Sequence, residues 1–366
     1  MYASRIEKVL KKMELYDFSQ ILISDPISIY YLTGKMLEPD ERLWALYIDC
    51  NGSHRAFVNE MFFCPRGFGN EKIFFSDLDD PVEVLCSAID KNSRLGVDKL
   101  FPAKFFVPMI HRLGLKDFEV SSLCVDEVRA VKDAKEIEWM RESSRINDLT
   151  MEKIAQFLSE GVTEIETADK IQQIYKELGA DIYPWGPSVC FGTNTAEAHH
   201  TPDKTSLRKG DIILIDTGCK VNEYGSDMTR VFCCGQEATP FQQEIYQIVR
   251  TATETAEKLC GPGVPLAEID RAARKVIEDA GYGANFNHRT GHFIGLETHD
   301  YGEVSPRNKE CTLPGNIFSI EPSIYLEGQF QLYVEDLVLI TEDGCEILNH
   351  YPHEIQVVGL SHENQK

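Results

Sequence analysis

The chain has 366 residues, which is enough for two domains with hydrophobic cores of their own. Its 59 acidic residues outnumber 37 basic ones, and the formal net charge of -22 argues against nucleic acid or an anionic membrane as a partner. The eleven cysteines are scattered and include no C-x-x-C pair, so they predict neither a disulfide framework nor a zinc knuckle.

The amino-terminal stretch MYASRIEKVLKKMEL is charged and amphipathic. It contains no apolar run long enough for a signal peptide or a membrane span. We therefore expect a reducing, cytoplasmic compartment and no membrane partner.

Strand and helix patterns alternate in the first third of the chain. FSQILISDPISIYYLTGK predicts a strand, a break marked by proline and a short helix. The strand-like segments RLWALYIDC and HRAFVNE follow, and SRLGVDKLF later begins another strand-helix unit. We place the end of this smaller α/β domain near the charged run VDEVRAVKDAKEIEWMRESS, which divides the chain into domains 1–130 and 131–366.

Two predicted helices in the second part have glycines at equivalent ends. GVTEIETADKIQQIYKELG occupies residues 161–179 and GVPLAEIDRAARKVIEDAG occupies residues 263–281, so both ends are separated by 102 residues. Thr163 and Glu166 have capping-box spacing in the first helix, and Pro265 suits the start of the second. The equal spacing predicts an internal duplication whose halves pack about a pseudo-twofold axis.

A predicted hairpin after the first helix contains two aspartates. In IDTGCKVNEYGSDMTRVF the flanks are strand-like, and NEYG supplies the Asn and Gly of a turn. Pairing Asp216 with Asp227 centres the turn near Val221 and Asn222 and brings the carboxylates face to face. Like charges opposite each other are destabilising, so both acids must point into solvent or share a cation. This hairpin alone favours solvated acids.

A second predicted hairpin, SIEPSIYLEGQFQLYVEDLVLI, changes that interpretation. Pairing Glu321 with Glu335 centres its turn on Gly328, the residue type that a tight reversal favours. Each acid again lies in an apolar strand, where a charge is costly unless it is paired or bound to metal. We therefore expect the acids of both hairpins to meet at one shared site between the two halves.

Histidines precede both hairpins. His199 and His200 lie before the first, and His288, His292 and His299 lie before the second. A single histidine is more often structural than a ligand. Four carboxylates converging with one imidazole are instead typical of divalent ions, and two such ions would balance the four negative charges. The pattern therefore predicts a dinuclear centre and metal-assisted hydrolysis.

The motifs IDTG…GSDMTR, GHFIG…THD, IEPSIY and VEDLVLIT together resemble those of the pita-bread metallopeptidases. This family includes Xaa-Pro dipeptidase (prolidase), aminopeptidase P, methionine aminopeptidase and the metal-free creatinase. The resemblance extends over about two-thirds of the chain, from Lys132 to Tyr351. It implies an α/β fold of the α+β type, with a pita-bread catalytic domain that contains a pseudo-twofold internal repeat.

The resemblance also implies how the metal ligands divide. Asp216 binds one ion, Asp227 and Glu335 bridge both ions, and His292 and Glu321 bind the other. All five ligand types are present, which disfavours creatinase itself.

Four further roles follow from the same resemblance. Glu321 exchanges protons with the attacking water, and His199 and His299 line the substrate and steady the tetrahedral intermediate. His288 lies in the pocket on the leaving side. His200 has no counterpart and is interpreted as structural.

The first third of the chain resembles the creatinase-type N-terminal domain, which methionine aminopeptidase lacks. The implied activity is hydrolysis of the bond between an N-terminal residue and proline in small peptides, by a dipeptidase or an aminopeptidase. The oxygen-rich ligands favour two Mn²⁺ ions, with Co²⁺ or Zn²⁺ possible. We also expect a homodimer. The segment YPWGP, residues 183–187, is a candidate wall of the proline pocket, although a turn with core aromatics is the simpler interpretation.

Two departures from the family pattern support an alternative function, a catalytically weakened module that binds peptide or protein without cleaving it. Ser323 replaces the usual glycine after EP, and Tyr333 replaces the usual arginine. The resemblance pairs that arginine with Asp216. A tyrosine there predicts looser metal binding at Asp216, unless another cation such as Arg230 takes over the contact.

Overall fold

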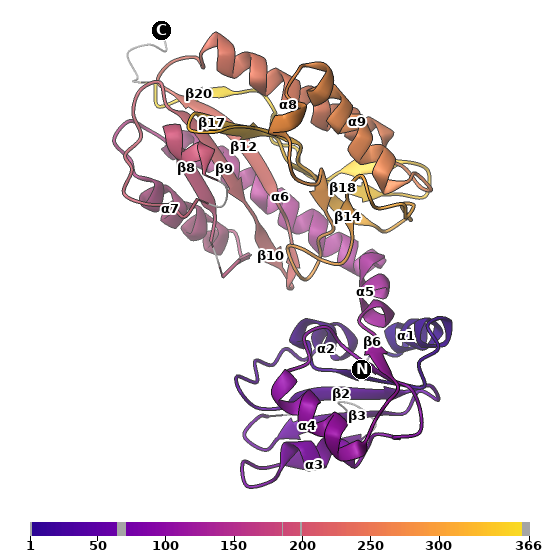
Figure 1. Cartoon of the computed structure of the whole chain (residues 1–366). Coiled ribbons are helices and arrows are strands. Elements are labelled where there is room, and N and C mark those ends of the chain that lie inside the picture. Colours follow the sequence, from indigo (N-terminus) through magenta and orange to yellow (C-terminus); the bar gives the residue numbers. More distant parts are fainter. Residues whose placement is uncertain (1, 64–70, 185, 198–199, 361–366) are drawn as a thin grey trace. The chain divides into compact units, whose positions relative to one another are not determined.

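The structure is a computed structural model that describes residues 2–63, 71–184, 186–197 and 200–360 (Figure 1). The chain divides into two compact units, Met1–Arg129 and Ala130–Lys366. No helix among the described residues combines the length and the apolar character that crossing a lipid bilayer requires.

The first unit is a six-stranded mixed sheet in the order β4-β3-β2-β1-β5-β6. Its pairs β1–β5, β5–β6 and β3–β4 are parallel, and the other two are antiparallel. Figure 1 shows α1 and α2 on one face of the sheet and α3 and α4 on the other. The elements are α1 (Ala3–Leu15), β1 (Gln20–Ile23), α2 (Pro26–Thr33), β2 (Trp44–Asp49), β3 (His54–Asn59), β4 (Glu71–Phe75), α3 (Pro81–Cys86), β5 (Leu95–Val97), α4 (Ala103–Leu113), β6 (Phe118–Val120) and α5 (Leu123–Ala130).

The break predicted around Pro26 is confirmed as the start of α2. The Asp25 side chain accepts hydrogen bonds from the backbone N–H groups of Ile27 and Ser28, and Pro26 occupies the first turn. Proline is favoured there because its missing N–H would have no helical partner. Local chemistry therefore determines this strand-to-helix connection.

The second unit consists of several short sheets between two helix pairs. The larger sheets have the orders β20-β12-β9-β8 and β15-β18-β19. Its helices are α6 (Ala134–Phe157), α7 (Glu164–Glu177), α8 (Pro240–Leu259) and α9 (Leu266–Asp279), with the short helices η1 (Gly192–Ala196) and η2 (Gly283–Asn285). Its strands are β7 (Asp181–Ile182), β8 (Ser188–Phe191), β9 (Ile212–Thr217), β10 (Cys219–Val221), β11 (Tyr224–Gly225), β12 (Met228–Cys234), β13 (Gly291–His292), β14 (Glu303–Val304), β15 (Ile317–Ile320), β16 (Ser323–Leu326), β17 (Phe330–Tyr333), β18 (Asp336–Ile340), β19 (Cys345–Ile347) and β20 (Gln356–Val358).

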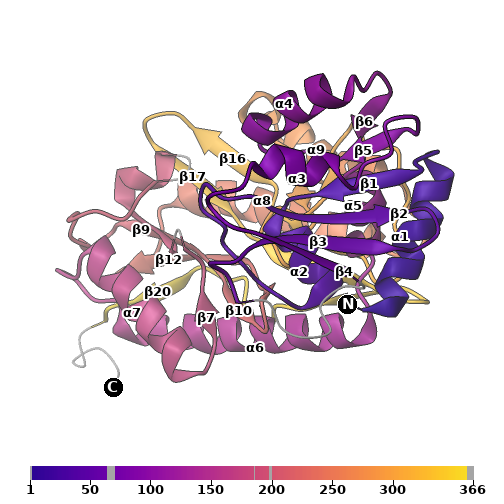
Figure 2. The same ribbon diagram turned by 90° about the horizontal axis from the view of Figure 1, so that it is seen from below.

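The helix pairs confirm the predicted internal repeat. Helices α7 and α9 have 14 residues each, and the expected capping box of Thr163 and Glu166 begins α7. Figures 1 and 2 show the strands of this unit between the α6–α7 pair and the α8–α9 pair. Each pair buries an apolar face against the strands beside it, so the centre of the unit is enclosed from two sides.

The register of the second hairpin agrees with the prediction. Leu326 pairs with Phe330 around Gly328, whose φ of 68° lies in the region that glycine adopts easily. The same register continues from β16–β17 into β15–β18, where Ile320 pairs with Asp336. Glu321 and Glu335 therefore face each other at the break between the two strand pairs.

The register of the first hairpin differs from the prediction by two residues. Asp216 lies opposite Thr229, not opposite Asp227. The turn is formed by Asn222 and Glu223, which have φ values of 50° and 71°. Positive φ at both central residues matches the twist of a two-residue hairpin, and this turn chemistry decides the register. The sequence prediction assumed that the two acids pair, and it therefore placed the centre of the turn too early in the chain.

Candidate metal centre

A cavity of about 460 Å³ lies within the second unit. Both halves of the repeat contribute acidic and histidine side chains to its wall. These lining residues are Asp216, Asp227, His288, His292, His299, Glu321 and Glu335. The described structure therefore brings seven of the eight predicted site residues to one place.

The remaining predicted residue, His199, lies outside the described residues.

Breaks in the strands present three of the four acids to the cavity, and the fourth, Asp216, lies within β9. Asp216 lies near the end of β9, and Asp227 lies between β11 and β12. Glu321 directly follows β15, and Glu335 lies between β17 and β18. A carboxylate at such a break is not committed to one face of a regular sheet, so Asp227, Glu321 and Glu335 can converge with Asp216.

A short bridge between Thr229 and Glu335 connects the two hairpins. The Thr229 hydroxyl donates a hydrogen bond of 2.9 Å to Glu335 Oε2. Thr229 also pairs with Asp216 in the β9–β12 ladder. One threonine therefore links the acid-bearing strands of both halves.

His292 is buried beside three carboxylates. Its Nε2 atom lies 3.5 Å from Glu321 Oε1 and 3.9 Å from both Asp227 Oδ2 and Glu335 Oε1. One donor atom from each of Asp227, His292 and Glu335 falls within 4.8 Å of the others. A Cβ at Gly291 would lie only 1.8 Å from Ser319 O, so this glycine allows β13 to approach β15 and bring the imidazole into place.

The carboxyl groups raise one another's pKa values in the protein alone. Burial, followed by the Asp216 and Glu321 charges, raises the pKa of Asp227 well above its usual range. Burial and the Asp227 charge do the same to the pKa of Glu335. The pKa of Glu321 rises to about 8 because of burial and Asp216. A cation entering the centre would therefore displace protons from these groups.

The pKa of the His292 imidazole shifts in the opposite direction. Burial, together with the neighbouring His299, lowers the pKa of His292 to about 3. The ring is then neutral at physiological pH and has a lone pair for a metal. Carboxylate oxygens with one neutral imidazole nitrogen form a donor set suited to hard or borderline divalent ions. The residues present therefore fit the implied metal centre.

Tyr333 contacts the acid that the resemblance assigns to one metal ion. Its hydroxyl donates a hydrogen bond of 2.8 Å to Asp216 Oδ2. Burial raises the pKa of Tyr333, so the phenol remains protonated and able to donate. Arg230 does not replace the missing arginine, because its five N–H groups bond to Asp336 and to backbone carbonyls.

His288 takes part in a chain of hydrogen bonds. Its Nδ1 lies 2.7 Å from Arg289 O, which fixes the proton on Nδ1 and leaves Nε2 as an acceptor. Ser323 Oγ lies 2.6 Å from Nε2 and itself accepts from Gln331 Nε2 at 3.1 Å. Burial lowers the pKa of His288, which keeps the ring neutral. Ser323 therefore orients the imidazole that the sequence assigns to the leaving side.

His299 lies beside His292. The two rings meet edge to face with centroids 4.3 Å apart. His299 is thus close to the acids but does not belong to the tight donor group of Asp227, His292 and Glu335. This position agrees with a place on the substrate side of the ligands.

Glu164, His200 and Asp203 form another cluster of possible ligands. The buried Glu164 carboxylate already accepts from the backbone N–H groups of Phe191 and Asp203 and from Asn194 Nδ2. His200 Nε2 lies 2.8 Å from Glu164 Oε2, the oxygen that also accepts from the Asp203 N–H. Because these contacts satisfy the group, the cluster fits the structural role expected of His200.

Sequence reasoning missed Thr229, Gln331 and Arg289, which contact the ligands or line the cavity. Thr229 lies two residues after Asp227, so the alternation of a strand could have indicated it. The other two have no comparable signal. Of the candidate wall YPWGP, Tyr183 and Gly186 line the cavity, and Trp185 lies outside the described residues.

Two family profiles account for most of the chain. The profile of metallopeptidase family M24 matches residues 138–342, and that of the creatinase/prolidase N-terminal domain matches residues 5–131. A protein of Staphylococcus haemolyticus described as an uncharacterized peptidase is 34% identical over 359 residues, which cover 95% of this chain and 99% of that protein.

Solved structures of peptidases match over nearly the whole length. A recombinant prolidase from Thermococcus sibiricus has a TM-score of 0.90 and 30% identity, covering 98% of this chain and 99% of its own. A dipeptidase from Pyrococcus horikoshii has a TM-score of 0.88 and 32% identity, covering 97% and 100%. The expected fold, a pita-bread domain after a creatinase-like domain, is confirmed.

Substitutions should separate the residues that hold metal from those beside it. Asp227→Asn and Glu335→Gln are expected to lose metal and turnover together, because each removes a charge from the donor group. His299→Ala should retain metal and lose mainly kcat. Metal content measured by mass spectrometry and steady-state kinetics would check this, with Asp279→Asn, an exposed acid at the end of α9, as the control. Equal metal loss in Asp227→Asn, Glu335→Gln and His299→Ala would contradict the division.

Tyr333 should control how tightly one ion binds. Tyr333→Phe removes the donor to Asp216 and is expected to weaken that ion by about 10-fold or more, the usual effect of losing a partner of a ligand. Tyr333→Arg should tighten it, because it adds a positive charge. Calorimetric titration of metal-free protein with Mn²⁺ measures both, and Tyr325→Phe serves as a control. Unchanged or weaker binding by Tyr333→Arg would show that no charge is missing.

Proposed function

The chain belongs to metallopeptidase family M24, and on this premise we propose that it hydrolyses the bond between an N-terminal residue and proline in small peptides. The observation that carries the proposal is the convergence of Asp216, Asp227, Glu321, Glu335 and His292 on one buried cavity. These five side chains would hold two divalent ions, and their predominance of oxygen donors favours Mn²⁺ over Co²⁺ or Zn²⁺. When bound, the ions supply Lewis acidity and lower the pKa of water.

The protein's own groups would handle the protons. In the protein alone, the Glu321 carboxyl has a pKa of about 8 and accepts a hydrogen bond from Ser319 Oγ, which fixes its orientation. Bound cations would lower that pKa and leave the carboxylate ionised, and we assign it to take a proton from water and return it to the leaving nitrogen. His299 would steady the developing negative charge, and we propose the same for His199.

The chemistry of proline suits this arrangement. The Xaa-Pro bond is a tertiary amide, so the residue after the cut has no N–H to offer to a peptidase. A rigid centre that would bind the substrate's carbonyl and its free amino terminus does not need a hydrogen bond from the residue after the cut. Tyr183, Tyr325 and Tyr333 line the cavity and offer ring surface to a pyrrolidine.

Arg289 favours a dipeptide over longer substrates. It is the only lysine or arginine among the described residues that line the cavity. Its contact with Glu303 is long, at 3.7 Å, and its side chain is partly exposed. Arg289 could therefore receive the free carboxylate that a dipeptide has directly after its proline and a longer peptide lacks there. We accordingly propose Xaa-Pro dipeptidase rather than Xaa-Pro aminopeptidase.

A panel of peptides tests the activity. Metal-loaded protein is expected to cleave Ala-Pro, to cleave Ala-Pro-Ala weakly and to leave Met-Ala-Ala intact, with products identified by mass. Chelation should abolish cleavage, and Mn²⁺ should restore it. Preference for Ala-Pro-Ala would indicate an aminopeptidase. Absence of cleavage of all three peptides, in protein that does bind metal, would support a module that binds without cutting.

Arg289 can be tested separately. Arg289→Met should raise KM for Ala-Pro by about 10-fold or more, because a charged hydrogen bond to the carboxylate is lost. Hydrolysis of Ala-Pro-amide, which has no carboxylate, should be unaffected. Arg289→Lys is expected to retain part of the preference, and Arg271→Met on the exposed face of α9 is the control. The same KM change for both substrates would exclude carboxylate recognition.

A further inference from the structure

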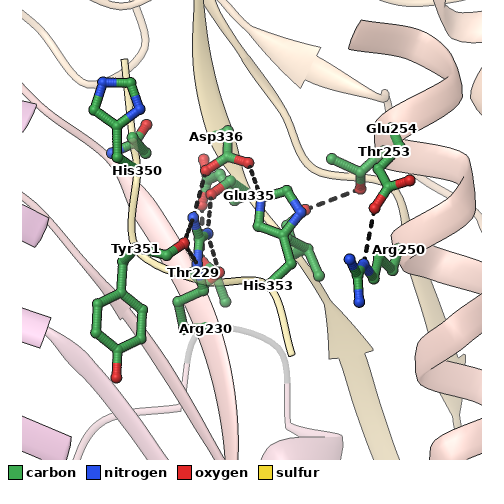
Figure 3. A network of polar contacts seen from close by, with 12 residues as sticks. Thr229, Arg230, Arg250, Thr253, Glu254, Glu335, Asp336, His350, Tyr351 and His353 are labelled. Carbon is green, nitrogen blue, oxygen red and sulfur yellow. Dashed lines mark hydrogen bonds and ion pairs between the residues drawn. The ribbon is translucent and has the colours of Figure 1, made fainter. Parts of the chain in front are cut away.

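Arg230 is buried behind the metal-ligand Glu335, on strand β12. It is 1% exposed, and its guanidinium uses all five of its N–H groups (Figure 3). Nε and Nη2 donate to Tyr351 O at 3.0 and 2.8 Å, and Nη2 donates to Asp336 Oδ1 at 2.7 Å. Nη1 donates to Thr229 O at 2.9 Å and to Glu335 O at 2.8 Å.

The two Nη1 contacts span the connection between the hairpins. At the Thr229–Glu335 bridge, both backbone N–H···O distances are 3.4 Å, which is long for a ladder hydrogen bond. The carbonyls of the same two residues are the ones that Arg230 binds at shorter distance. The backbone spacing between the halves therefore depends more on the guanidinium than on the ladder.

Residues that follow the second hairpin fix the guanidinium from the other side. Asp336 directly follows the ligand Glu335, is fully buried, and divides its two oxygens between Arg230 and His353. His353 Nε2 lies 2.5 Å from Asp336 Oδ2. Figure 3 shows Tyr351 and His353 on one loop segment beside the pair, and this segment precedes β20. Both partners of the buried ion pair are thus anchored by neighbours.

We propose that Arg230 is a positioning residue for the metal centre, which sets the spacing between the two acid-bearing hairpins and is fixed by Asp336, Tyr351 and His353. It touches no ligand side chain and acts through the backbone of Thr229 and Glu335. The inference rests on the proposed metal centre. It adds that a segment beyond all five predicted ligands, residues 351–353, helps to determine metal affinity.

The geometry requires a guanidinium. Arginine has five donors in one plane, whereas lysine has three donors on a single nitrogen. An ammonium at position 230 could keep the charge pair with Asp336 but could not also reach both bridge carbonyls and Tyr351 O. Charge and positioning can therefore be separated by substitution.

A purely structural ion pair would predict a different result. Removing Arg230 alone leaves Asp336 buried without its charge partner and threatens the fold. Arg230→Met with Asp336→Leu removes both charges and restores apolar volume, so folding can be retained while the contacts to the bridge are lost. Arg250→Met is the control, because Arg250 on α8 forms ion pairs with Glu254 and Glu354 instead.

The experiment is a calorimetric titration of metal-free protein with Mn²⁺ alone, together with melting temperatures without metal and kcat for Ala-Pro at saturating Mn²⁺. The double variant is expected to melt near the Arg250→Met control yet bind Mn²⁺ about 10- to 100-fold more weakly. Arg230→Lys should bind with intermediate affinity. In both variants, kcat should fall more than KM rises, because the ligands are misplaced.

Each outcome decides the question. Mn²⁺ affinity within about twofold of the parent in Arg230→Lys and in the double variant would overturn the positioning role, since loss of a partner of this kind costs more. If the double variant does not fold, Arg230→Lys decides by the same criterion. A parent protein that binds no Mn²⁺ would overturn the metal centre itself, and this inference with it.

Discussion

Four carboxylates share one buried cavity, and their mutual repulsion is the constraint on which the rest of the catalytic unit depends. In the protein alone, burial and neighbouring charges keep the pKa values of Asp227, Glu321 and Glu335 high. Buried carboxylates are stable when they are protonated, paired or bound to a cation, and a cation entering the cavity would remove the repulsion. The duplicated architecture suits this need, because each half supplies two acids from strand ends and neither half encloses the site alone.

The acids are held in place by hydrogen bonds from neutral side chains and from one charged side chain that bonds to the backbone beside them. Thr229 supports Glu335 from the opposite hairpin, Tyr333 supports Asp216, and Arg230 fixes the backbone between the hairpins. Only Arg230 is charged, and Asp336 neutralises it locally. The supporting groups therefore orient the ligands without supplying the positive charge that metal ions would bring.

Most of the fold could be predicted because its signals are local. Gly328 determined the second turn, and equal helix spacing revealed the repeat. The first register was wrong because the two acids were assumed to pair, whereas the backbone of Asn222 and Glu223 sets the turn. Contacts such as Arg230 with Tyr351 could not be predicted, because they join residues 121 apart through one carbonyl, which leaves no pattern in the sequence.

The two departures from the family pattern are neighbours in space. Ser323 and Tyr333 lie directly opposite each other in the β16–β17 pair, so their side chains share one face of the hairpin. Tyr333 bonds to Asp216, an acid of the proposed metal centre, and Ser323 bonds to His288, which the resemblance places on the leaving side. Directly opposite side chains on one ladder interact, so each shapes the space of the other. Because the two positions are neighbours on one hairpin, we expect a substitution at either one to alter both the contact to Asp216 and the contact to His288.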